Sequence, residues 1–255
     1  MDSQPILEIL IVVLATLCGS TVLSTLGFGI GMVATPILLL VFDPQTAIVT
    51  LSPAGTVLSA LIAWKNRHHI LMRETLPIAL LGMVGAFTGV YLLSTSDAQL
   101  LKIAIVILII PLTVLSFFNP TNLKDRIPFP NIVGPFIGYL VGLMLGSMAI
   151  GGPLLVIFLI VRGWKSYAIR GSMSFFLLCV MVCALVGFVP AGLYGEGRIT
   201  LSAIAFIPMI VGFWAGSRIA NKLNESLFRK CSVAVIVLSS LTVLIREFPW
   251  PQGIF

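Results

Sequence analysis

The chain has 255 residues, of which 58% are hydrophobic and only 9% are charged. Soluble domains carry about 25% charged residues, so this composition excludes a soluble globular protein and predicts an all-α polytopic membrane protein. The formal net charge of +6 does not indicate nucleic-acid binding, because lysines and arginines gather in the cytoplasmic loops of membrane proteins.

Eight charge-poor runs follow one another along the chain. They lie at residues 6–42, 45–64, 75–94, 98–118, 132–161, 166–190, 199–217 and 231–245. Six of them suit a single crossing, which takes about 20 residues. The first and the fifth are too long, because their uncharged parts would extend about 51 Å and 45 Å as straight helices across a hydrocarbon core of about 30 Å. Each of these two runs must tilt, break or fold back.

Both overlong runs contain glycine clusters. The first holds GFGIG at residues 27–31, and the second holds GLMLGSMAIGGP at residues 142–153. Glycine weakens a helix, and backbone leaves the helical form at membrane depth only where it is buried or lines a cavity. We therefore expect each run to be a broken helix or hairpin whose tip lies at the glycines.

The charges of the links support the hairpin interpretation. Net basic links lie at residues 64–74, 122–126, 162–170 and 218–230, whereas the two termini and the links at 43–45, 94–97 and 191–198 are not basic. Hairpins that enter and leave on the same side place every basic link on one side of the membrane. The positive-inside rule makes that side cytoplasmic, so both termini are predicted to lie outside.

The two halves of the chain resemble each other. Gly31 matches Gly152 at an offset of 121 residues, and the GxxxG segment at 85–89 matches the one at 212–216 at an offset of 127. GxxxG segments mainly indicate close helix packing. Together with the glycine breaks and the shared order of segments, however, they predict an internal repeat.

Each half contains one hairpin and three transmembrane helices, so the second half is inverted relative to the first. The predicted organisation is a first repeat at residues 1–118, a cytoplasmic linker at 119–131 and a second repeat at 132–255, in one membrane domain. Inverted repeats with broken helices are typical of secondary transporters. We expect the two glycine tips to meet near the midplane and to frame a substrate site.

The first tip with its proline, GFGIGMVATP at residues 27–36, and the weaker GGPLLV at 151–156 resemble the sulfite exporter TauE/SafE family of membrane permeases. The paired GxxxG segments and the chain length are also similar to that family. The resemblance covers nearly the whole chain and implies a two-repeat permease for a small anion, often sulfite or an organosulfonate, in the bacterial cytoplasmic (inner) membrane. The second tip departs from the family's pattern, because Met148 and Ile150 replace glycines.

A small oxyanion needs hydrogen-bond donors and positive potential. Backbone N–H groups where helices restart after the glycines would supply both, although glycines that only allow close packing are the alternative. The flanking hydroxyls could contact substrate or bond their own helix, and Arg170 could bind the anion or lie at the cytoplasmic interface. The candidate substrate-binding residues are Gly27, Gly29, Gly31, Ser24, Thr25, Thr50, Ser52, Ser147, Gly151, Gly152, Ser172 and Arg170.

The sequence therefore indicates an anion permease whose partners are the small anion and the lipid bilayer, with a homodimer as an open alternative to a monomer. An outgoing monoanion gains about 2.3 kcal/mol per 100 mV, which favours export without a coupling ion. A non-transporting membrane scaffold and an intramembrane enzyme are the alternatives, but His68 and His69 lie in a loop and no HExxH motif occurs. No catalytic residue, metal site or cofactor is predicted, because GFGIG lacks the GK[ST] of a nucleotide loop and the cysteines form no CxxC pair.

Overall fold

The structure is a computed structural model that describes residues 4–26, 29–115 and 130–219. Within these ranges the chain forms nine α-helices and one short 3-10 helix, η1 (Arg67–His69), and no β-strand. The α-helices are α1 (Gln4–Leu26), α2 (Ile30–Leu38), α3 (Pro44–Lys65), α4 (Met72–Thr95), α5 (Ala98–Leu115), α6 (Pro130–Met148), α7 (Gly152–Val161), α8 (Ser166–Phe188) and α9 (Glu196–Ile219). The all-α prediction is confirmed.

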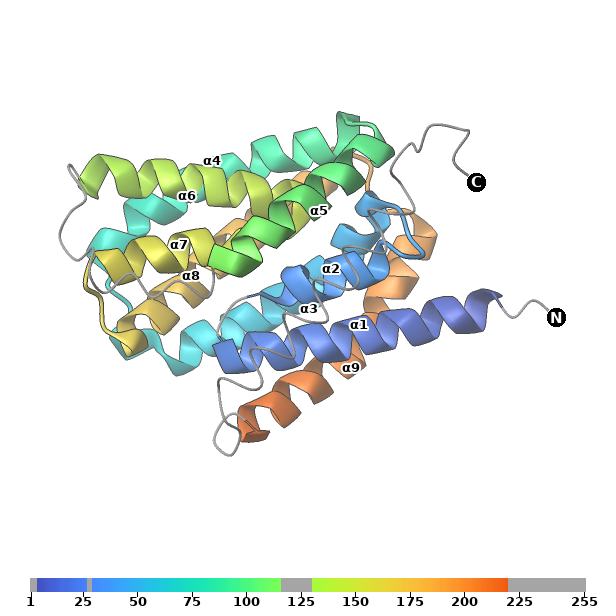
Figure 1. The fold of residues 1–255 in the computed structure, drawn as a ribbon, viewed down its shortest axis with the longest axis horizontal. Helices are drawn as coiled ribbons and strands as arrows, with labels where there is room; N and C mark the ends of the chain where they lie inside the picture. Colours follow the sequence, from blue (N-terminus) through green and yellow to red (C-terminus); the bar gives the residue numbers. More distant parts are fainter. Residues whose placement is uncertain (1–3, 27–28, 116–129, 220–255) are drawn as a thin grey trace.

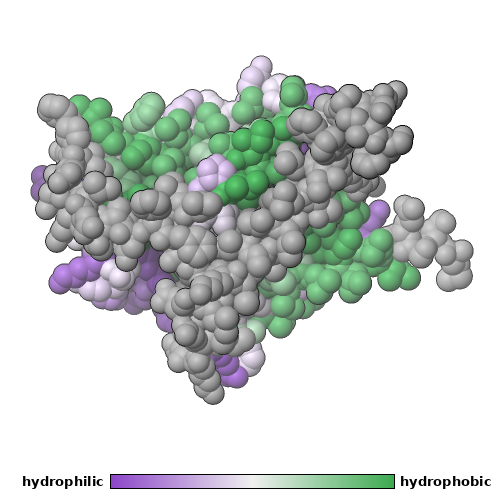
Figure 2. All heavy atoms as spheres, in the orientation of Figure 1, coloured by the Kyte–Doolittle hydropathy of each residue, from purple (hydrophilic) through white to green (hydrophobic). Residues whose placement is uncertain are grey.

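Five of the described helices, α1, α3, α4, α8 and α9, are long and apolar enough to cross a membrane. On the face shown in Figure 2, apolar side chains make up most of the described surface at the top and the right, and hydrophilic ones are seen mainly at the lower left and at the upper and lower edges. Ile6, Leu100 and Ile207, for example, are largely exposed, which suits contact with lipid rather than water. The prediction of a multi-pass membrane protein is confirmed.

Both overlong runs break at their glycines. The helix that follows each break is capped by a glycine with positive φ, Gly29 at 96° before α2 and Gly151 at 134° before α7. Residues with a side chain rarely adopt these conformations, so the two glycines determine where α2 and α7 begin. After each break the chain turns back, so that α2 packs on α1 and α7 packs on α6 (Figure 1).

Helices from one half of the chain pack on helices from the other. α1 lies against α9 and α4 lies against α6, while α3 contacts α8 between them. The GxxxG segments make these contacts close: a Cβ added at Gly85 would collide with the carbonyl oxygen of Tyr139 in α6, and one at Gly212 would meet Ser20 in α1. Their expected packing role is confirmed. An inverted repeat predicts this reciprocal pairing, and the repeat itself stays a prediction.

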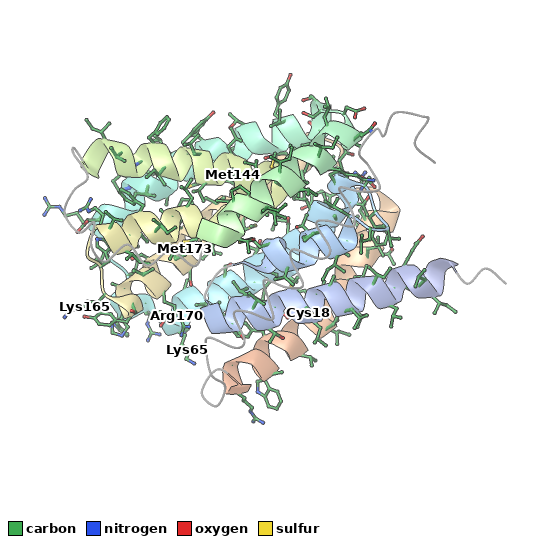
Figure 3. All side chains as sticks on the ribbon, in the orientation of Figure 1. Cys18, Lys65, Met144, Lys165, Arg170 and Met173 are labelled. Carbon is green, nitrogen blue, oxygen red and sulfur yellow. The ribbon has the colours of Figure 1, made fainter. Side chains whose placement is uncertain are left out.

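The two basic links that the structure describes in full, residues 64–74 and 162–170, lie at one end of the helix bundle. η1 and residues 162–165 lie at that end, whereas the start of α1 and residues 39–43 lie at the other (Figure 1). Lys65, Lys165 and Arg170 are found together at the same basic end (Figure 3). Which side of the membrane this end faces stays a prediction.

Three predicted segments fall largely outside the described residues. They are the linker at 119–131, the basic link at 218–230 and the charge-poor run at 231–245. The last two residues of that linker begin α6.

Candidate functional site

The two helix breaks meet inside the protein. Gly31, in the first turn of α2, lies against the backbone of Ala149 in the second break, and a Cβ added at position 31 would collide with the Ala149 carbonyl oxygen. Only glycine permits so close an approach. The expectation that the two glycine tips meet therefore agrees with their positions in the structure.

A small cavity lies where the breaks meet. Its lining comes from both breaks and from α1, α3, α6 and α8, and consists of Leu23, Gly29, Ile30, Gly31, Met32, Gly55, Ser59, Leu145, Ala149, Ile150, Gly151, Gly152, Leu177 and Met181. Its volume of about 20 Å³ is enough for about one water molecule. A larger anion such as sulfite therefore fits only after lining residues have moved.

Two helix N-termini point at this cavity. The first hydrogen bonds at these ends run from the Val33 N–H to the Gly29 carbonyl, at 3.4 Å, and from the Leu154 N–H to the Gly151 carbonyl, at 3.2 Å. The N–H groups that precede them have no partner within their own helix. A helix N-terminus also carries the equivalent of about +0.5 elementary charge, so both ends favour an anion.

One hydroxyl in the lining escaped the sequence analysis. Ser59 in α3 lines the cavity and is only 4% exposed. Within the described part of the chain its hydroxyl makes no hydrogen bond. Ser59 lies one helical turn after Gly55, and this pair of small residues on one face was the signal that could have identified it.

The predicted glycines and the predicted hydroxyls lie in different places in the structure. Gly29, Gly31, Gly151 and Gly152 line the cavity. Three hydroxyls outside the lining instead donate within their own helices: Ser24 to the Thr21 carbonyl at 3.0 Å, Ser52 to the Ile48 carbonyl at 2.7 Å, and Ser147 to the Leu143 carbonyl at 2.7 Å. Such bonds are common for serines in helices.

The remaining predicted residues lie elsewhere. The Ser172 hydroxyl accepts a bond from the Leu71 N–H at 3.1 Å, and Arg170 lies at the basic end of the bundle (Figure 3). Neither lines the cavity. Gly27 and the side chain of Thr25 lie outside the described part of the chain.

Thr50 has a different environment from the other hydroxyls. It lies nine residues before Ser59 on α3, which places it on the opposite side of the helix and outside the cavity lining. The hydroxyl oxygens of Thr50 and Thr35 are buried and have no hydrogen-bond partner in the described structure. Leaving a buried hydroxyl unpaired costs about 1–3 kcal/mol. A contact between Thr50 and the substrate stays a prediction.

A family model described as "Sulfite exporter TauE/SafE" matches residues 11–243, nearly the whole chain. The chain belongs to the sulfite exporter TauE/SafE family. TauE/SafE proteins are membrane transporters of sulfite and related sulfur anions, so this member is a multi-pass membrane protein of a transporter family. Neither a curated protein nor a solved structure matches the chain.

Proposed function

We propose that this TauE/SafE protein is a permease that exports sulfite or an organosulfonate across the bacterial cytoplasmic membrane, and that the anion binds between the two helix breaks. The observation that carries the proposal is the convergence of the N-termini of α2 and α7 on one buried cavity. Free N–H groups and the helix dipoles both favour an anion there.

The composition of the cavity supports an anion over a cation. No Asp or Glu is among the residues that line it, whereas cation sites at membrane depth usually gather oxygen ligands and often a carboxylate. A non-transporting scaffold would need the glycines only for packing, and would not need an unpaired hydroxyl such as that of Ser59 beside them.

The proposed direction of transport follows from the charge of the cargo. The basic end of the bundle is proposed to face the cytoplasm, and an anion that leaves a negative cytoplasm gains about 2.3 kcal/mol per charge per 100 mV. Single cysteines can test the orientation in a background that lacks the native ones. Ala98→Cys should react with an impermeant thiol reagent on intact cells and His68→Cys should not; the opposite pattern would reverse the topology.

Anion flux tests the transport proposal. Purified protein in proteoliposomes should move sulfite or a simple sulfonate in the direction set by an imposed potential. Gly29→Leu and Gly152→Leu should reduce that flux to background while the protein stays folded in the membrane, because leucine fills the space between the breaks. Correctly inserted protein that moves no small anion would instead support the scaffold.

A further inference from the structure

The charge of the cavity limits the charge of the anion that it can hold. None of the residues that line it is Lys, Arg, His, Asp or Glu, so its positive potential comes from the N-termini of α2 and α7. Each is equivalent to about +0.5 elementary charge. Together the two ends compensate about one negative charge.

Ser59 is an independent sign of a ligand at the same place. Its side chain is buried and lines the cavity, yet in the described structure no group accepts a hydrogen bond from it. Ser52 and Thr56 on the same helix bond carbonyls one turn earlier, whereas the hydroxyl of Thr50 is also unpaired but lies on the opposite side of α3, away from the cavity. The Ser59 hydroxyl is therefore available to an oxygen atom in the cavity.

We propose that the site selects monovalent sulfur oxyanions, such as hydrogensulfite or a sulfonate, over divalent ones such as sulfate, and that Ser59 donates a hydrogen bond to the bound oxyanion. This inference rests on the proposed function. A divalent anion would leave about one charge uncompensated inside the membrane protein, where an unpaired charge is strongly unfavourable.

Flux measurements with two anions of similar shape test the charge selection. Methanesulfonate and sulfate are both tetrahedral sulfur oxyanions but carry one and two charges. Methanesulfonate should cross proteoliposome membranes at least about a hundredfold faster than sulfate, and sulfite flux should fall as rising pH removes the proton of hydrogensulfite. Comparable sulfate flux would overturn the charge selection alone. Absence of flux for every anion would instead contradict the proposed function.

Two hydroxyl deletions on α3 test the role of Ser59. Ser59→Ala should raise the KM for methanesulfonate about tenfold, as expected for one hydrogen bond to a charged group. Thr56→Val removes a hydroxyl that already bonds the Ser52 carbonyl at 2.7 Å, and should leave KM unchanged. Thermal unfolding of both variants controls for stability. An unchanged KM in Ser59→Ala would remove Ser59 from the site.

A second inference starts from charged side chains at the two ends of the bundle. At the end away from the described basic links, Arg198 near the start of α9 binds the N-terminal end of α3 and its capping residue. Its guanidinium donates to the Thr46 hydroxyl at 3.0 Å and to the Gln45 side-chain oxygen at 3.0 Å, and lies 3.5 Å from the Asp43 carboxylate. Asp43 also caps α3 by accepting the Thr46 N–H at 3.0 Å.

At the basic end, a single ion pair occupies the corresponding place. Glu74 near the start of α4 pairs with Arg162, which follows α7, at 2.6 Å. Glu74 is the third residue of α4 and Arg198 is the third residue of α9. Asp43 and Arg162 both lie in a link between a short helix and the next long one. The two ends therefore carry the same contact between the two halves with the charges reversed.

We infer that these two contacts hold opposite ends of the permease closed, so that losing either one opens the cavity to that end alone. Both contacts are formed in this structure, in which the cavity has room for only about one water molecule. Each joins residues from different halves of the chain, which must separate at one end at a time if the anion is to enter and leave.

Accessibility of a cavity residue tests this inference. Met181→Cys, in a background without Cys18, Cys179, Cys183 and Cys231, would report the access of an impermeant thiol reagent from each side of oriented vesicles. Arg198→Met removes the guanidinium that makes all three bonds while Asp43 still caps α3, and should raise labelling from the Asp43 end about tenfold. Glu74→Gln should raise labelling from the other end about fivefold, the effect of losing about 1 kcal/mol of an exposed ion pair.

Exchanging the charges separates a gating role from a merely structural one. Glu74→Arg combined with Arg162→Glu restores the ion pair and should return labelling to the parent rate. If both single variants are labelled from the same side, or if neither is labelled faster than the parent, the closing role is wrong.

Discussion

The break between α1 and α2 and the break between α6 and α7 differ in the residues that form them. The first combines Gly29 at φ 96° with Gly31, which has no side chain where the second break touches it. The second holds Ala149 at φ 57°, the one non-glycine residue with positive φ in the described ranges, followed by Gly151 at 134°.

This difference makes the two breaks complementary. A Cβ at position 31 would lie 3.0 Å from the Ala149 Cβ and closer still to its carbonyl oxygen, so the first break provides a gap and the second fills it. The second break also offers fewer donors to a ligand, because Pro153 has no N–H. The first break should therefore bind more of the anion's oxygens, and the second should be the more rigid of the two.

The largest effect is expected from closing the gap. Gly31→Val should abolish anion flux and lower the free energy of unfolding by about 3 kcal/mol or more, because its side chain collides with backbone that cannot rotate away. Flux in proteoliposomes and thermal unfolding in detergent measure the two effects. Gly197→Ala is the matched control, since a Cβ there meets nothing within 4 Å. A folded, active Gly31→Val protein would mean that the contact between the breaks is not required.

A smaller effect should separate the two capping glycines. Alanine at either position is strained by about 1–3 kcal/mol, and Gly151→Ala should destabilise more than Gly29→Ala. The φ of 134° at Gly151 lies farther from the left-handed helical region that alanine can adopt, and the Val141 carbonyl oxygen lies 3.3 Å from the added Cβ. Thermal unfolding of both variants gives the order, and the reverse order would contradict this account of the second break.

Relieving the backbone strain at Ala149 in the second break should raise the stability of the protein modestly, whereas the glycine substitutions lower it. Ala149→Gly removes a left-handed conformation that costs alanine about 1–2 kcal/mol, while glycine makes the unfolded chain more flexible by about 0.4–1 kcal/mol. The net expectation is a stabilisation of about 0.5–1 kcal/mol, measured by denaturant or thermal unfolding. A clear loss of stability would show that the alanine methyl contributes packing that outweighs its strain.

The smallest effect is expected from changing the number of backbone N–H donors at the start of α7. Pro153→Ala adds one N–H to the start of α7 and should lower the KM for the anion about threefold, as expected for a weak additional hydrogen bond. The free energy of unfolding should change by no more than about 1 kcal/mol. A KM that does not fall would indicate that the N-terminus of α7 does not contact the anion directly.

Much of the fold could be predicted from the sequence, because the thickness of the membrane limits the length of a spanning helix. An uncharged stretch that would extend about 51 Å as one straight helix is too long for a single crossing of about 30 Å of hydrocarbon, and Gly29 marks the place where the second helix of this stretch begins. The GxxxG segments were equally informative, because only small residues allow the approach of Gly85 to α6.

The site residues were harder to predict than the fold, since the sequence shows where a hydroxyl occurs but not its hydrogen-bond partner. Ser52 and Ser147 bond their own helices, while Ser59, which was not singled out, faces the cavity. The contacts of Arg198 were missed for a related reason. It lies 155 residues from Asp43 in the chain, and nothing local marks the two as neighbours.

The pairing of α1 with α9 has a consequence for how the protein is made. Thr21 in α1 donates to the Gly212 carbonyl in α9 at 3.1 Å, across 191 residues of sequence. At synthesis rates of about 5–20 residues per second, α9 is made roughly 10–40 s after α1. During that time the membrane must hold an unfinished half-protein whose small-residue face is uncovered. Insertion factors that shield such faces should therefore affect the yield of this permease more than its activity.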